Sequence, residues 1–468
     1  MTSVPGACWR SVFAVLHASR RCSHGHRRKM VKAPTLLALL VVVCLWCLYH
    51  GRDNKVGRYT RWLPGTMPEP DAKARYFVPV RGQPVFMYSA IANLHQPVDA
   101  AINIIITTLS ASRQSLQCCV LLDGKSLFVT PAEEFFQYHN FDVAFIAKIL
   151  EYFSADLYYA RQYSCSVPDT GHSAGHVTLT SSVCSPDIED FLQILYPPRV
   201  PGGLALCAKI AYNGGHDPEK VIEWVEVQLM LGVDKILIFD LGNPENLTRV
   251  FRYYQSLGVL DVQPYELPGS PANRTLWGAD TATVQFHHDE SMAVLECNQR
   301  MSGYTFVMSH DVDEFIIPRR DVTLKQFFKE KMETYQDGAG FFFEAEFFVY
   351  EWGPSHPKED LMVSRYRRAT KPHWECTKYM FLPHRTRGTI THTFFPLPPY
   401  RTYILGSEEA VIHHYRRCPH VWSSCDPETI IDNSMARFRG LHERVVKVRA
   451  ATNVRPDWTP EVNLSILP

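Results

Sequence analysis

Between residues 204 and 309, strand-like apolar segments alternate with amphipathic helix-like segments, and this alternation restricts the fold more than any other feature of the sequence. The spacing of apolar residues predicts helices at 217–232, 244–258 and 280–302. β-Branched and aromatic runs predict strands at 204–212, 235–241, 259–267 and from residue 304 onwards. Strands and helices at such intervals form βαβ units, so the segment predicts an α/β fold with a mostly parallel, doubly wound sheet.

Three carboxylates follow the last of these predicted strands, in the sequence "FVMSHDVDEF" (306–315). Ligands of wound sheets bind outside the carboxyl ends of the strands, and Asp311, Asp313 and Glu314 fall at such an end. Neighbouring carboxylates repel each other unless a cation lies between them, and Asp-x-Asp offers two oxygen ligands to Mg²⁺ or Mn²⁺. We therefore expect Asp313 to bind a metal ion directly and Asp311 to contact it through water or to hold the ribose of a nucleotide. Glu314 is expected to shape the turn, and a solvated turn without a metal is the alternative.

Residues 33–49, "APTLLALLVVVCLWCLY", contain no charged side chain and would span roughly 25 Å as a helix. Basic residues are denser before this segment than after it, which predicts a cytoplasmic tail at 1–32 and a lumenal body. A cleaved signal peptide is the alternative, but the basic region is long and no small-residue cleavage site follows Tyr49. We therefore expect an uncleaved type II transmembrane anchor.

The rest of the chain divides into three regions by composition. Residues 50–75 are polar and contain three prolines, as is typical of a stem. Short apolar segments separated by turn residues occupy 76–200 and predict a small all-β module. The α/β domain is expected to occupy 201–468, after a boundary rich in proline and glycine.

The composition argues against two classes of protein. Lysine plus arginine equals aspartate plus glutamate, with 48 of each, so no overall basic field favours nucleic acid. Nine cysteines follow the predicted anchor, and none has the C-x-x-C spacing of a zinc site.

In an oxidising lumen these nine cysteines form disulfides. We expect Cys118 or Cys119 to pair with Cys165, and the odd number leaves at least one cysteine without a partner in the chain. Three glycosylation sequons fit a lumenal body, at Asn246, Asn273 and Asn463.

Several blocks of the α/β region occur in the order and spacing of a known family. They are "EWVEVQLMLGVDKILIFD" (223–240), "YYQSLGVLDVQPYELP" (253–268), "ECNQRMSGYTFVMSHDVDEFIIP" (296–318), "CTKYMFLPHRT" (376–386) and "AVIHHYR" (410–416). Over residues 200–420 the chain resembles glycosyltransferase family 92. The resemblance implies a GT-A fold, a sugar-nucleotide donor and inverting transfer. Similar animal members are β-1,4-galactosyltransferases of the Golgi membrane that use UDP-galactose and Mn²⁺ on glycan acceptors, and the resemblance implies the same for this chain.

One departure from the family pattern lies in this region. The family has Asn-Asp-Cys before the Asp-x-Asp strand, whereas this chain has Leu295-Glu296-Cys297. The change puts a family contact in doubt and favours a second hypothesis, a catalytically inactive GT-A-like protein that binds glycans. A third hypothesis, a glycoside hydrolase with paired carboxylates, predicts neither nucleotide binding nor a metal requirement.

The resemblance also implies roles for residues near other strand ends. Tyr212 and Asp240 follow the first two strands, where the uridine would lie, although Asp240 is equally suited to capping the next helix. His413 and His414 are expected to include a further metal ligand. Neutral imidazole suits Mn²⁺ better than Mg²⁺, so a histidine ligand favours manganese.

Cationic side chains for the diphosphate come from the later blocks of the resemblance. Arg416 is expected to bind the diphosphate, with Arg417 directly after it. Lys378 and Arg385 are weaker candidates for the same role. Exposed arginines without a ligand are the alternative.

Inverting transfer requires a general base for the acceptor hydroxyl, on the face opposite the leaving group. Glu344 and Glu346 lie two residues apart in the apolar run 340–353 and therefore share one face of a predicted strand. An apolar core does not favour such charges, so we expect one of the pair to be the base. Solvation at a strand edge is the alternative, and Glu375 and Asp426 are rival candidates.

The acceptor is expected to lie beside aromatic side chains. Trp352 and Trp374 would stack on its sugar, and a place in the core is the alternative for each. The expected protein is thus a GT-A glycosyltransferase domain preceded by a small all-β module, a stem and an N-terminal transmembrane helix.

Overall fold

The computed structural model describes residues 77–95, 101–110, 114–124, 126–137, 159–168, 173–212, 216–265, 275–276, 279–418 and 429–455. All of them belong to one compact unit that spans 68–418 and 424–456. The predicted tail, anchor and stem lie outside the described ranges and stay predictions, as do Asp426, Asn273 and Asn463. Among the helices of the described ranges, none is both long enough and apolar enough to cross a membrane.

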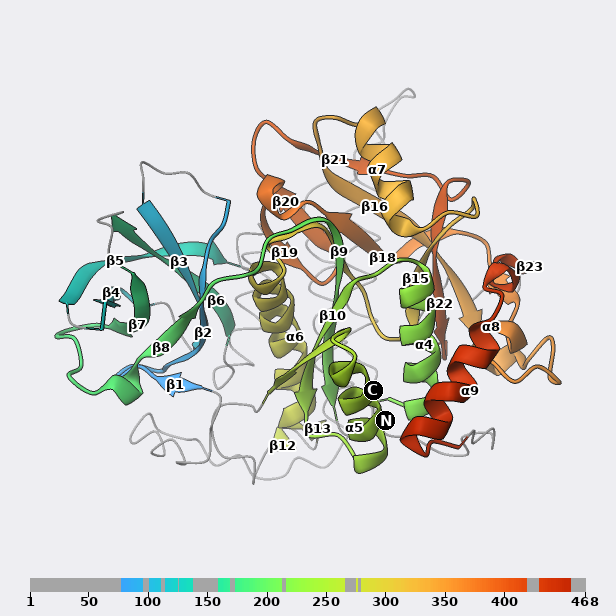
Figure 1. The fold of residues 1–468 in the computed structure, drawn as a ribbon, viewed down its shortest axis with the longest axis horizontal. Helices are drawn as coiled ribbons and strands as arrows, with labels where there is room; N and C mark the ends of the chain where they lie inside the picture. The colour runs from blue at the N-terminus through green and yellow to red at the C-terminus, as the bar shows by residue number, and fades with distance from the viewer. Residues whose placement is uncertain are drawn as a thin grey trace, which may run out of the picture. The chain divides into compact units, whose positions relative to one another are not determined.

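The first part of the unit consists of β-strands that close on themselves (Figure 1, blue to green). The strands pair in the order β1-β2-β3-β6-β5-β4-β7-β8, and β8 also pairs with β2, so β2 to β8 form a ring without a free edge. We call this ring the β-barrel. Its elements are β1 (Val78–Pro79), β2 (Val85–Ala92), β3 (Ala101–Ser110), β4 (Gln117–Leu122), β5 (Ser126–Gln137), β6 (Tyr159–Pro168), β7 (Ala174–Thr180), the 3-10 helix η1 (Ile188–Asp190) and β8 (Leu192–Leu195).

Alternate residues of the barrel strands form one buried core, which includes Val85, Ile104 and Val120. Two disulfides join strands around this core. Cys118 is bonded to Cys165 and Cys119 to Cys184, so Cys118 is the partner of Cys165. In the chain-entropy model the contribution of each bond grows with the length of the closed loop, and these bonds join residues 47 and 65 positions apart.

A nine-stranded mixed sheet forms the second part of the unit. Its strands follow the order β11-β10-β9-β14-β18-β16-β22-β15, with β21 beside β16. The pairs β11–β10, β10–β9 and β9–β14 are parallel, whereas β14 pairs with β18 in the antiparallel sense. The strands are β9 (Val200–Tyr212), β10 (Lys235–Leu241), β11 (Leu260–Pro264), β14 (Tyr304–Ser309), β15 (Glu314–Pro318), β16 (Gly338–Val349), β18 (His373–Phe381), β21 (Arg401–Ile404) and β22 (Ala410–Arg416).

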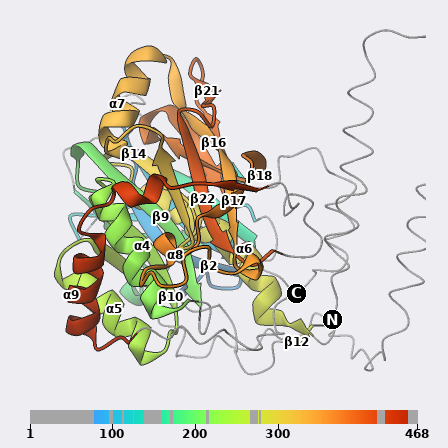
Figure 2. The same cartoon turned by 90° about the vertical axis from the view of Figure 1, so that its right-hand side faces the viewer.

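Helices cover both sides of the parallel strands. Figures 1 and 2 show α4 (Pro218–Met230), α5 (Glu245–Ser256) and α9 (Leu441–Thr452) on one side of β9 and β10, and α6 (Thr281–Arg300) on the other. Helix α4 begins where the Asp217 side chain accepts the backbone N–H of Glu219 at 2.9 Å, and Pro218 occupies its first turn. Each predicted helix of 204–309 is present with ends within a few residues, because the apolar period is a local property.

Short elements complete the described part of this region. They are β12 (Thr275–Leu276) paired with β13 (Ala279–Asp280), β17 (Arg368–Thr370) paired with β23 (Thr429–Ile431), β19 (Thr386–Ile390) paired with β20 (Thr393–Pro396), the helices α7 (Leu324–Thr334) and α8 (Met362–Arg365), and the 3-10 helices η3 (Tyr350–Trp352), η4 (Pro383–Arg385) and η6 (Ser434–Arg437).

The β-barrel and the mixed sheet share one hydrophobic core. Tyr88 and Leu109 of the barrel belong to the same buried cluster as Cys207, Phe239 and Leu295. Helix α6 contacts β3 and β6 on one side and β9 on the other, so it lies between the two sheets. This shared core predicts that the two parts fold together.

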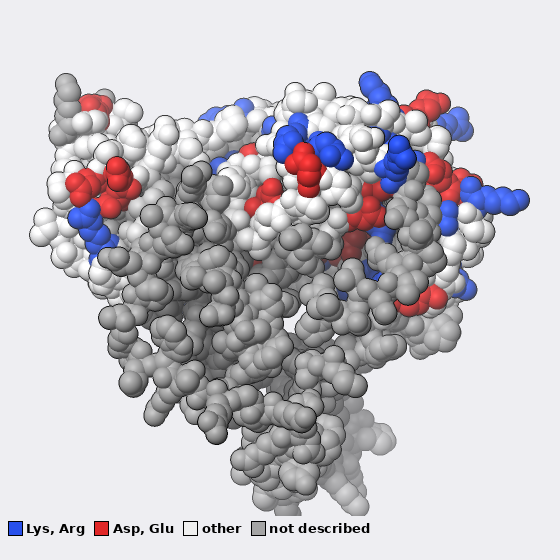
Figure 3. Space-filling model, turned by 90° about the horizontal axis from the view of Figure 1, so that it is seen from below, with Lys and Arg blue, Asp and Glu red and all other residues white. Residues whose placement is uncertain are grey.

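Acidic and basic side chains lie close together over the described part of the face in Figure 3. Exposed ion pairs of the described residues include Arg252 with Glu245 at 3.0 Å and Lys325 with Asp234 at 2.5 Å. Such exposed pairs contribute little to stability. The mixture fits the equal totals of acidic and basic residues in the sequence.

Candidate active site

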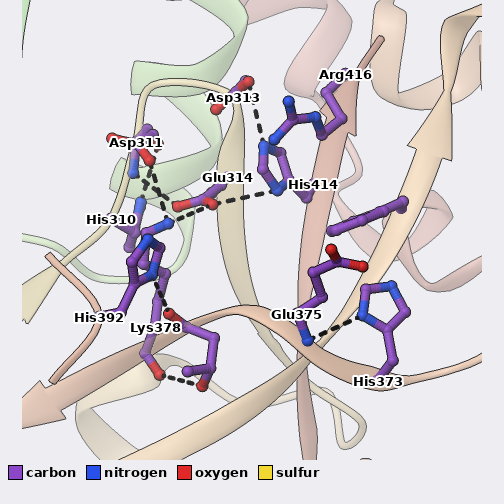
Figure 4. A network of polar contacts seen from close by, with 12 residues as sticks. His310, Asp311, Asp313, Glu314, His373, Glu375, Lys378, His392, His414 and Arg416 are labelled. Atoms are coloured by element: carbon purple, nitrogen blue, oxygen red, sulfur yellow. Dashed lines mark hydrogen bonds and ion pairs between the residues drawn. The ribbon is translucent and has the colours of Figure 1, made fainter. Parts of the chain in front are cut away.

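The acidic cluster forms a tight turn, Asp311–Glu314, between β14 and β15. The backbone N–H of Asp311 donates to Glu314 Oε2 at 2.8 Å, and the backbone N–H of Glu314 donates to the Asp311 carbonyl at 3.1 Å. Strand β22 holds the middle of the turn, because the Tyr415 N–H donates to the Asp313 carbonyl at 2.9 Å. The turn is therefore fixed from inside and from a neighbouring strand (Figure 4).

Two buried lysines neutralise Asp311. Lys209 Nζ lies 2.8 Å from Asp311 Oδ1 and 3.1 Å from Oδ2, and Lys378 Nζ lies 3.1 Å from Oδ2. Burial alone would raise the pKa of Asp311, but the ammonium groups of Lys209 and Lys378 hold that pKa well below its usual range. Asp311 therefore stays ionised at any physiological pH.

The same lysines contact two further carboxylates. Lys378 Nζ lies 2.7 Å from Glu314 Oε1, and Lys209 Nζ forms an ion pair with Glu290 of α6. Three carboxylates, those of Glu290, Asp311 and Glu314, thus contact two ammonium groups, and a fourth, that of Asp313, lies in the same turn. The excess of negative charge is the electrostatic condition for binding a divalent cation.

Asp313 lies beside a histidine. Its carboxylate Oδ2 is 3.4 Å from His414 Nε2, and the opposite ring nitrogen, Nδ1, is 3.3 Å from Glu314 Oε1 (Figure 4). Burial would raise the pKa of Asp313, and His414 lowers it below the usual value. The Asp313 side chain keeps 46% of its surface exposed, so this carboxylate is accessible to a ligand.

Asp313, Glu314 and His414 form a donor set that suits a metal ion. One ligand atom from each lies within 4.8 Å of the other two. Of these groups, the Asp313 carboxylate and the His414 imidazole match the ligand preferences of Mn²⁺, whereas Mg²⁺ prefers oxygen ligands alone. Glu314 Oε1 lies 3.3 Å from the opposite ring nitrogen of His414, which is the place from which a carboxylate commonly orients a metal-binding imidazole.

His413 belongs to a different network. Its Nε2 lies 3.5 Å from Asp432 Oδ2 and 3.8 Å from Glu346 Oε2, and all three side chains are buried. Arg319 forms ion pairs with both Glu346 and Asp432. The structure therefore does not bring His413 or Glu346 to the Asp313 turn. Consecutive residues of a strand point to opposite faces, and this alternation separates His413 from His414.

The predicted uridine residues differ in how well the structure defines them. Tyr212 ends β9 and pairs with Leu241 of β10, and the position of its side chain lies outside what the structure describes. Asp240 Oδ1 accepts from the backbone N–H of Asn243 at 3.2 Å and from its side-chain amide at 2.5 Å. Asp240 thus holds the turn that precedes α5. It does not cap that helix, because the N-cap residue of α5 is Pro244 and no side chain caps it.

The four cationic side chains predicted to bind phosphate lie in different surroundings. Figure 4 places Arg416 next to Asp313 and His414, with its guanidinium carbon 5.9 Å from the centre of the Phe347 ring. Arg385 instead donates to the carbonyls of Gln336 and Gly338, both at 2.8 Å, and stabilises a loop. Arg417 is exposed, and Lys378 is buried against the acidic turn.

A bulge in β18 brings Glu375 towards the same site. Phe343 pairs with Lys378 and Ala345 pairs with His373, so residues 374–377 stand opposite Glu344 alone. The Glu375 N–H donates to His373 Nδ1 at 3.2 Å, and Figure 4 shows Glu375 on the side of the sheet that carries His414. Bulges of this kind re-aim side chains beside active sites.

The predicted acceptor residues lie near this bulge or beyond it. Trp374, inside the bulge, exposes 45% of its surface and is accessible to a sugar. Trp352 is half-buried in η3, with the Arg368 guanidinium 5.3 Å from its ring centre. Trp374 is therefore the better placed of the two.

Lys209 and Glu290 are site residues that the sequence patterns did not predict. Lys209 is the single charged residue of the apolar run "LALCAKIAY", and a charge in a buried strand is rare unless it is paired. That rarity was the available signal. The identity of its partners required the strand order and the position of α6.

In the departure Leu295-Glu296-Cys297, the glutamate side chain contacts the β-barrel rather than the acidic turn. Glu296 is fully buried and accepts from Ser89 Oγ at 2.5 Å and from Arg300 Nε at 2.6 Å. Cys297 is bonded to Cys207 of β9. The unusual glutamate thus has a structural role at the barrel contact, and it no longer favours an inactive site.

A family model and one curated protein match the sequence. The model described as "Glycosyltransferase family 92" matches residues 203–453. The protein "Beta-1,4-galactosyltransferase galt-1" of Caenorhabditis elegans is 23% identical over 129 residues. That match spans 27% of this chain and 28% of the relative, so the chain covers less than a third of the relative's length.

Two of the matching solved structures show distant likeness. The structure titled "Crystal structure of S. aureus TarS 1-349" matches 39% of this chain and 47% of its own at 11% identity, with a TM-score of 0.23. A glucosyl-3-phosphoglycerate synthase of Mycobacterium tuberculosis, in complex with Mn²⁺, UDP and glucosyl-3-phosphoglycerate, matches 56% and 82% at 12% identity, with a TM-score of 0.21. TM-scores this low do not establish a common fold.

Proposed function

This chain belongs to glycosyltransferase family 92, and we propose that it is a metal-dependent inverting enzyme that transfers galactose from UDP-galactose to a glycan acceptor in β-1,4 linkage. The observation that carries this proposal is the group Asp313, Glu314 and His414 at the carboxyl end of β14. The name of the Caenorhabditis elegans relative supports galactose and the β-1,4 linkage. We further propose a GT-A catalytic domain in the Golgi lumen, anchored by 33–49, and the disulfides of the described region support an oxidising compartment.

Asp313 and His414 Nε2 are the groups that would hold Mn²⁺ or Mg²⁺, and the imidazole favours Mn²⁺. When bound, the ion supplies positive charge for the departing diphosphate of UDP. Glu314 Oε1 lies 3.3 Å from His414 Nδ1, on the side of the ring away from Asp313, and would help to orient the imidazole so that Nε2 faces Asp313. Arg416 lies beside Asp313 and binds the same diphosphate through charge-assisted hydrogen bonds.

Glu375 is the general base in this proposal. It takes the proton of the acceptor hydroxyl while that oxygen bonds to C1 of galactose and UDP leaves with the electrons of the broken bond. Its support is its place on the His414 side of the sheet, whereas the Glu346 carboxylate is buried between Arg319 and His413. Glu344, half-buried opposite the bulge, is the second candidate, and Trp374 would stack on the acceptor sugar.

The test is a transfer assay with the full-length protein purified in detergent. A panel of UDP-sugars is supplied with Mn²⁺ and glycans that end in galactose, fucose or N-acetylglucosamine, and the products are analysed by mass and NMR. We expect a hexose to be added from UDP-galactose only when Mn²⁺ is present, and the Asp313→Asn variant to be inactive. Glycan binding without turnover would instead favour the inactive glycan-binding protein.

A further inference from the structure

We propose that Lys209 and Lys378 are positioning residues that keep Asp311 from binding the metal ion, so that Asp313 is the metal ligand of the Asp-x-Asp pair. This inference rests on the metal dependence of the proposed function. It gives Lys209 the role of holding Asp311, in addition to neutralising the charge of that carboxylate.

Both oxygens of Asp311 already lie against ammonium groups. Lys209 Nζ is 2.8 Å from Oδ1 and 3.1 Å from Oδ2, and Lys378 Nζ is 3.1 Å from Oδ2. A dication that approached these oxygens would come within a few ångströms of two fixed positive charges, and Coulomb repulsion would oppose it. The exposed 37% of Asp311 remains suited to a neutral donor such as a ribose hydroxyl.

A local irregularity in the backbone of β9 directs the Lys209 side chain towards Asp311. Leu237 of β10 pairs with Cys207 and Phe239 pairs with Ile210, so β9 contains one extra residue at this point. Lys209 has a φ of +57°, a left-handed conformation that is costly for any residue with a Cβ. Strain of this kind persists where the surroundings fix it, and here it directs a charged side chain into the site.

Two features fix the strained segment in place. The Cys207–Cys297 disulfide joins β9 to α6 two residues before Lys209. Glu290, on the same helix, forms the second ion pair of the Lys209 ammonium. A buried ammonium needs such partners, because an isolated charge in the interior is strongly disfavoured.

Lys378 is the second ammonium group beside Asp311, and it also forms an ion pair with the carboxylate of Glu314. Its Nζ is 2.7 Å from Glu314 Oε1, while Glu314 Oε2 accepts the Asp311 N–H. Asp313 alone of the three acidic residues in the turn has a histidine rather than a lysine beside its carboxylate. The two lysines therefore pair with Asp311 and Glu314 and leave the Asp313 carboxylate to bind the metal ion.

The test measures Mn²⁺ affinity by electron paramagnetic resonance of the free ion, with the full-length protein in detergent and UDP present. The variants are Asp313→Asn, Asp311→Asn, Lys209→Met and the Lys209→Met/Asp311→Asn double variant. We expect Asp313→Asn to weaken Mn²⁺ binding by about tenfold or more, and Asp311→Asn to leave it within about threefold of the wild type. Lys209→Met is expected to tighten Mn²⁺ binding by about threefold or more, because it releases Asp311 Oδ1, which Lys209 contacts at 2.8 Å, and removes a positive charge, while Lys378 stays beside Oδ2.

The double variant should return to wild-type affinity, because it no longer has the released carboxylate. A merely structural role for Lys209 would lower the melting temperature without tightening Mn²⁺ binding. If Lys209→Met does not fold, the comparison of Asp311→Asn with Asp313→Asn decides alone, and equal losses in those two variants overturn the inference. Absence of Mn²⁺ binding by the wild type would instead overturn the proposed function.

Discussion

His413 and His414 are consecutive residues of β22, yet their imidazoles lie in two separate polar networks. His414 lies between Asp313 and Glu314, at 3.4 and 3.3 Å, whereas His413 faces Asp432 at 3.5 Å on the other side of the strand. One network opens to ligands through Asp313, and the other is buried. The alternation of a single strand thus separates a chemical role from a structural one.

This separation predicts different consequences for two neighbouring substitutions. His414→Ala should weaken Mn²⁺ binding by roughly tenfold or more, and it should also lower the melting temperature, because this imidazole is buried and packs against Phe347. His413→Ala should destabilise the protein, since it leaves Asp432 and Glu346 with one partner fewer, and should leave Mn²⁺ affinity near the wild-type value. Titration of Mn²⁺ and thermal melts of both variants check this, and loss of affinity in His413→Ala alone would reverse the assignment.

Glu375→Gln should abolish transfer while UDP and Mn²⁺ still bind, because the amide cannot accept the acceptor proton. The expected loss of kcat is on the order of 10²–10⁴-fold. Glu344→Gln is the matched control at the position opposite the bulge, and it should retain most of the activity. Full activity in Glu375→Gln, or an equal loss in Glu344→Gln, would move the base elsewhere.

Glu223 predicts a pH dependence of stability. It is fully buried in α4, accepts from the backbone N–H groups of Met362 and Val363 at 2.8 and 2.6 Å, and burial raises its pKa from 4.5 to about 7. Between pH 4.5 and 7 the folded protein keeps a proton that the unfolded chain has released, so this group lowers the free energy of unfolding as pH rises.

The Glu223→Gln variant should therefore gain stability relative to the wild type as the pH rises from 5 to 7.5. The comparison of two proteins is needed because buried histidines act in the opposite direction; burial lowers the pKa of His373 to about 4, for example. The difference in melting temperature between variant and wild type should become more positive at the higher pH. A difference that is constant with pH would mean that Glu223 does not titrate in this range.

The shared core predicts that the catalytic region does not fold without the β-barrel. A fragment that starts at residue 201 would expose the apolar side of α6 and leave Glu296 without Ser89. We expect no cooperative thermal transition for this fragment, whereas a chain that starts at residue 68 should melt as one unit. Normal cooperative unfolding of the shorter fragment would show that the barrel is dispensable for folding.

The sequence predicts the elements of this fold better than it predicts the partners in the site. The helix predicted at 217–232 is α4, Pro218–Met230, because apolar spacing and an Asp-Pro start are local signals. Lys209 and Asp311 are 102 residues apart, and their contact depends on strand order and on a bulge in β9. Neither property is encoded in a local period.

The paired glutamates show the same limit. Spacing of two placed Glu344 and Glu346 on one face of a strand, but it carried no information about the side chains that face would meet. Glu346 meets Arg319 of a distant segment, and the β18 bulge brings Glu375 towards the site instead. The face of a strand on which a residue lies was predictable from the sequence. The partners that its side chain meets were not, because they depend on how several strands pack together.

The most direct test of the account is the effect of UDP on thermal stability with and without Mn²⁺. At a hundredfold excess over Kd, a ligand that binds only the folded state should raise the melting temperature of the full-length protein by roughly 3 °C. We predict this increase only when UDP and Mn²⁺ are both present, and none for Asp313→Asn. An unchanged melting temperature of the wild type with both ligands, or an equal increase in Asp313→Asn, would contradict the proposed nucleotide site.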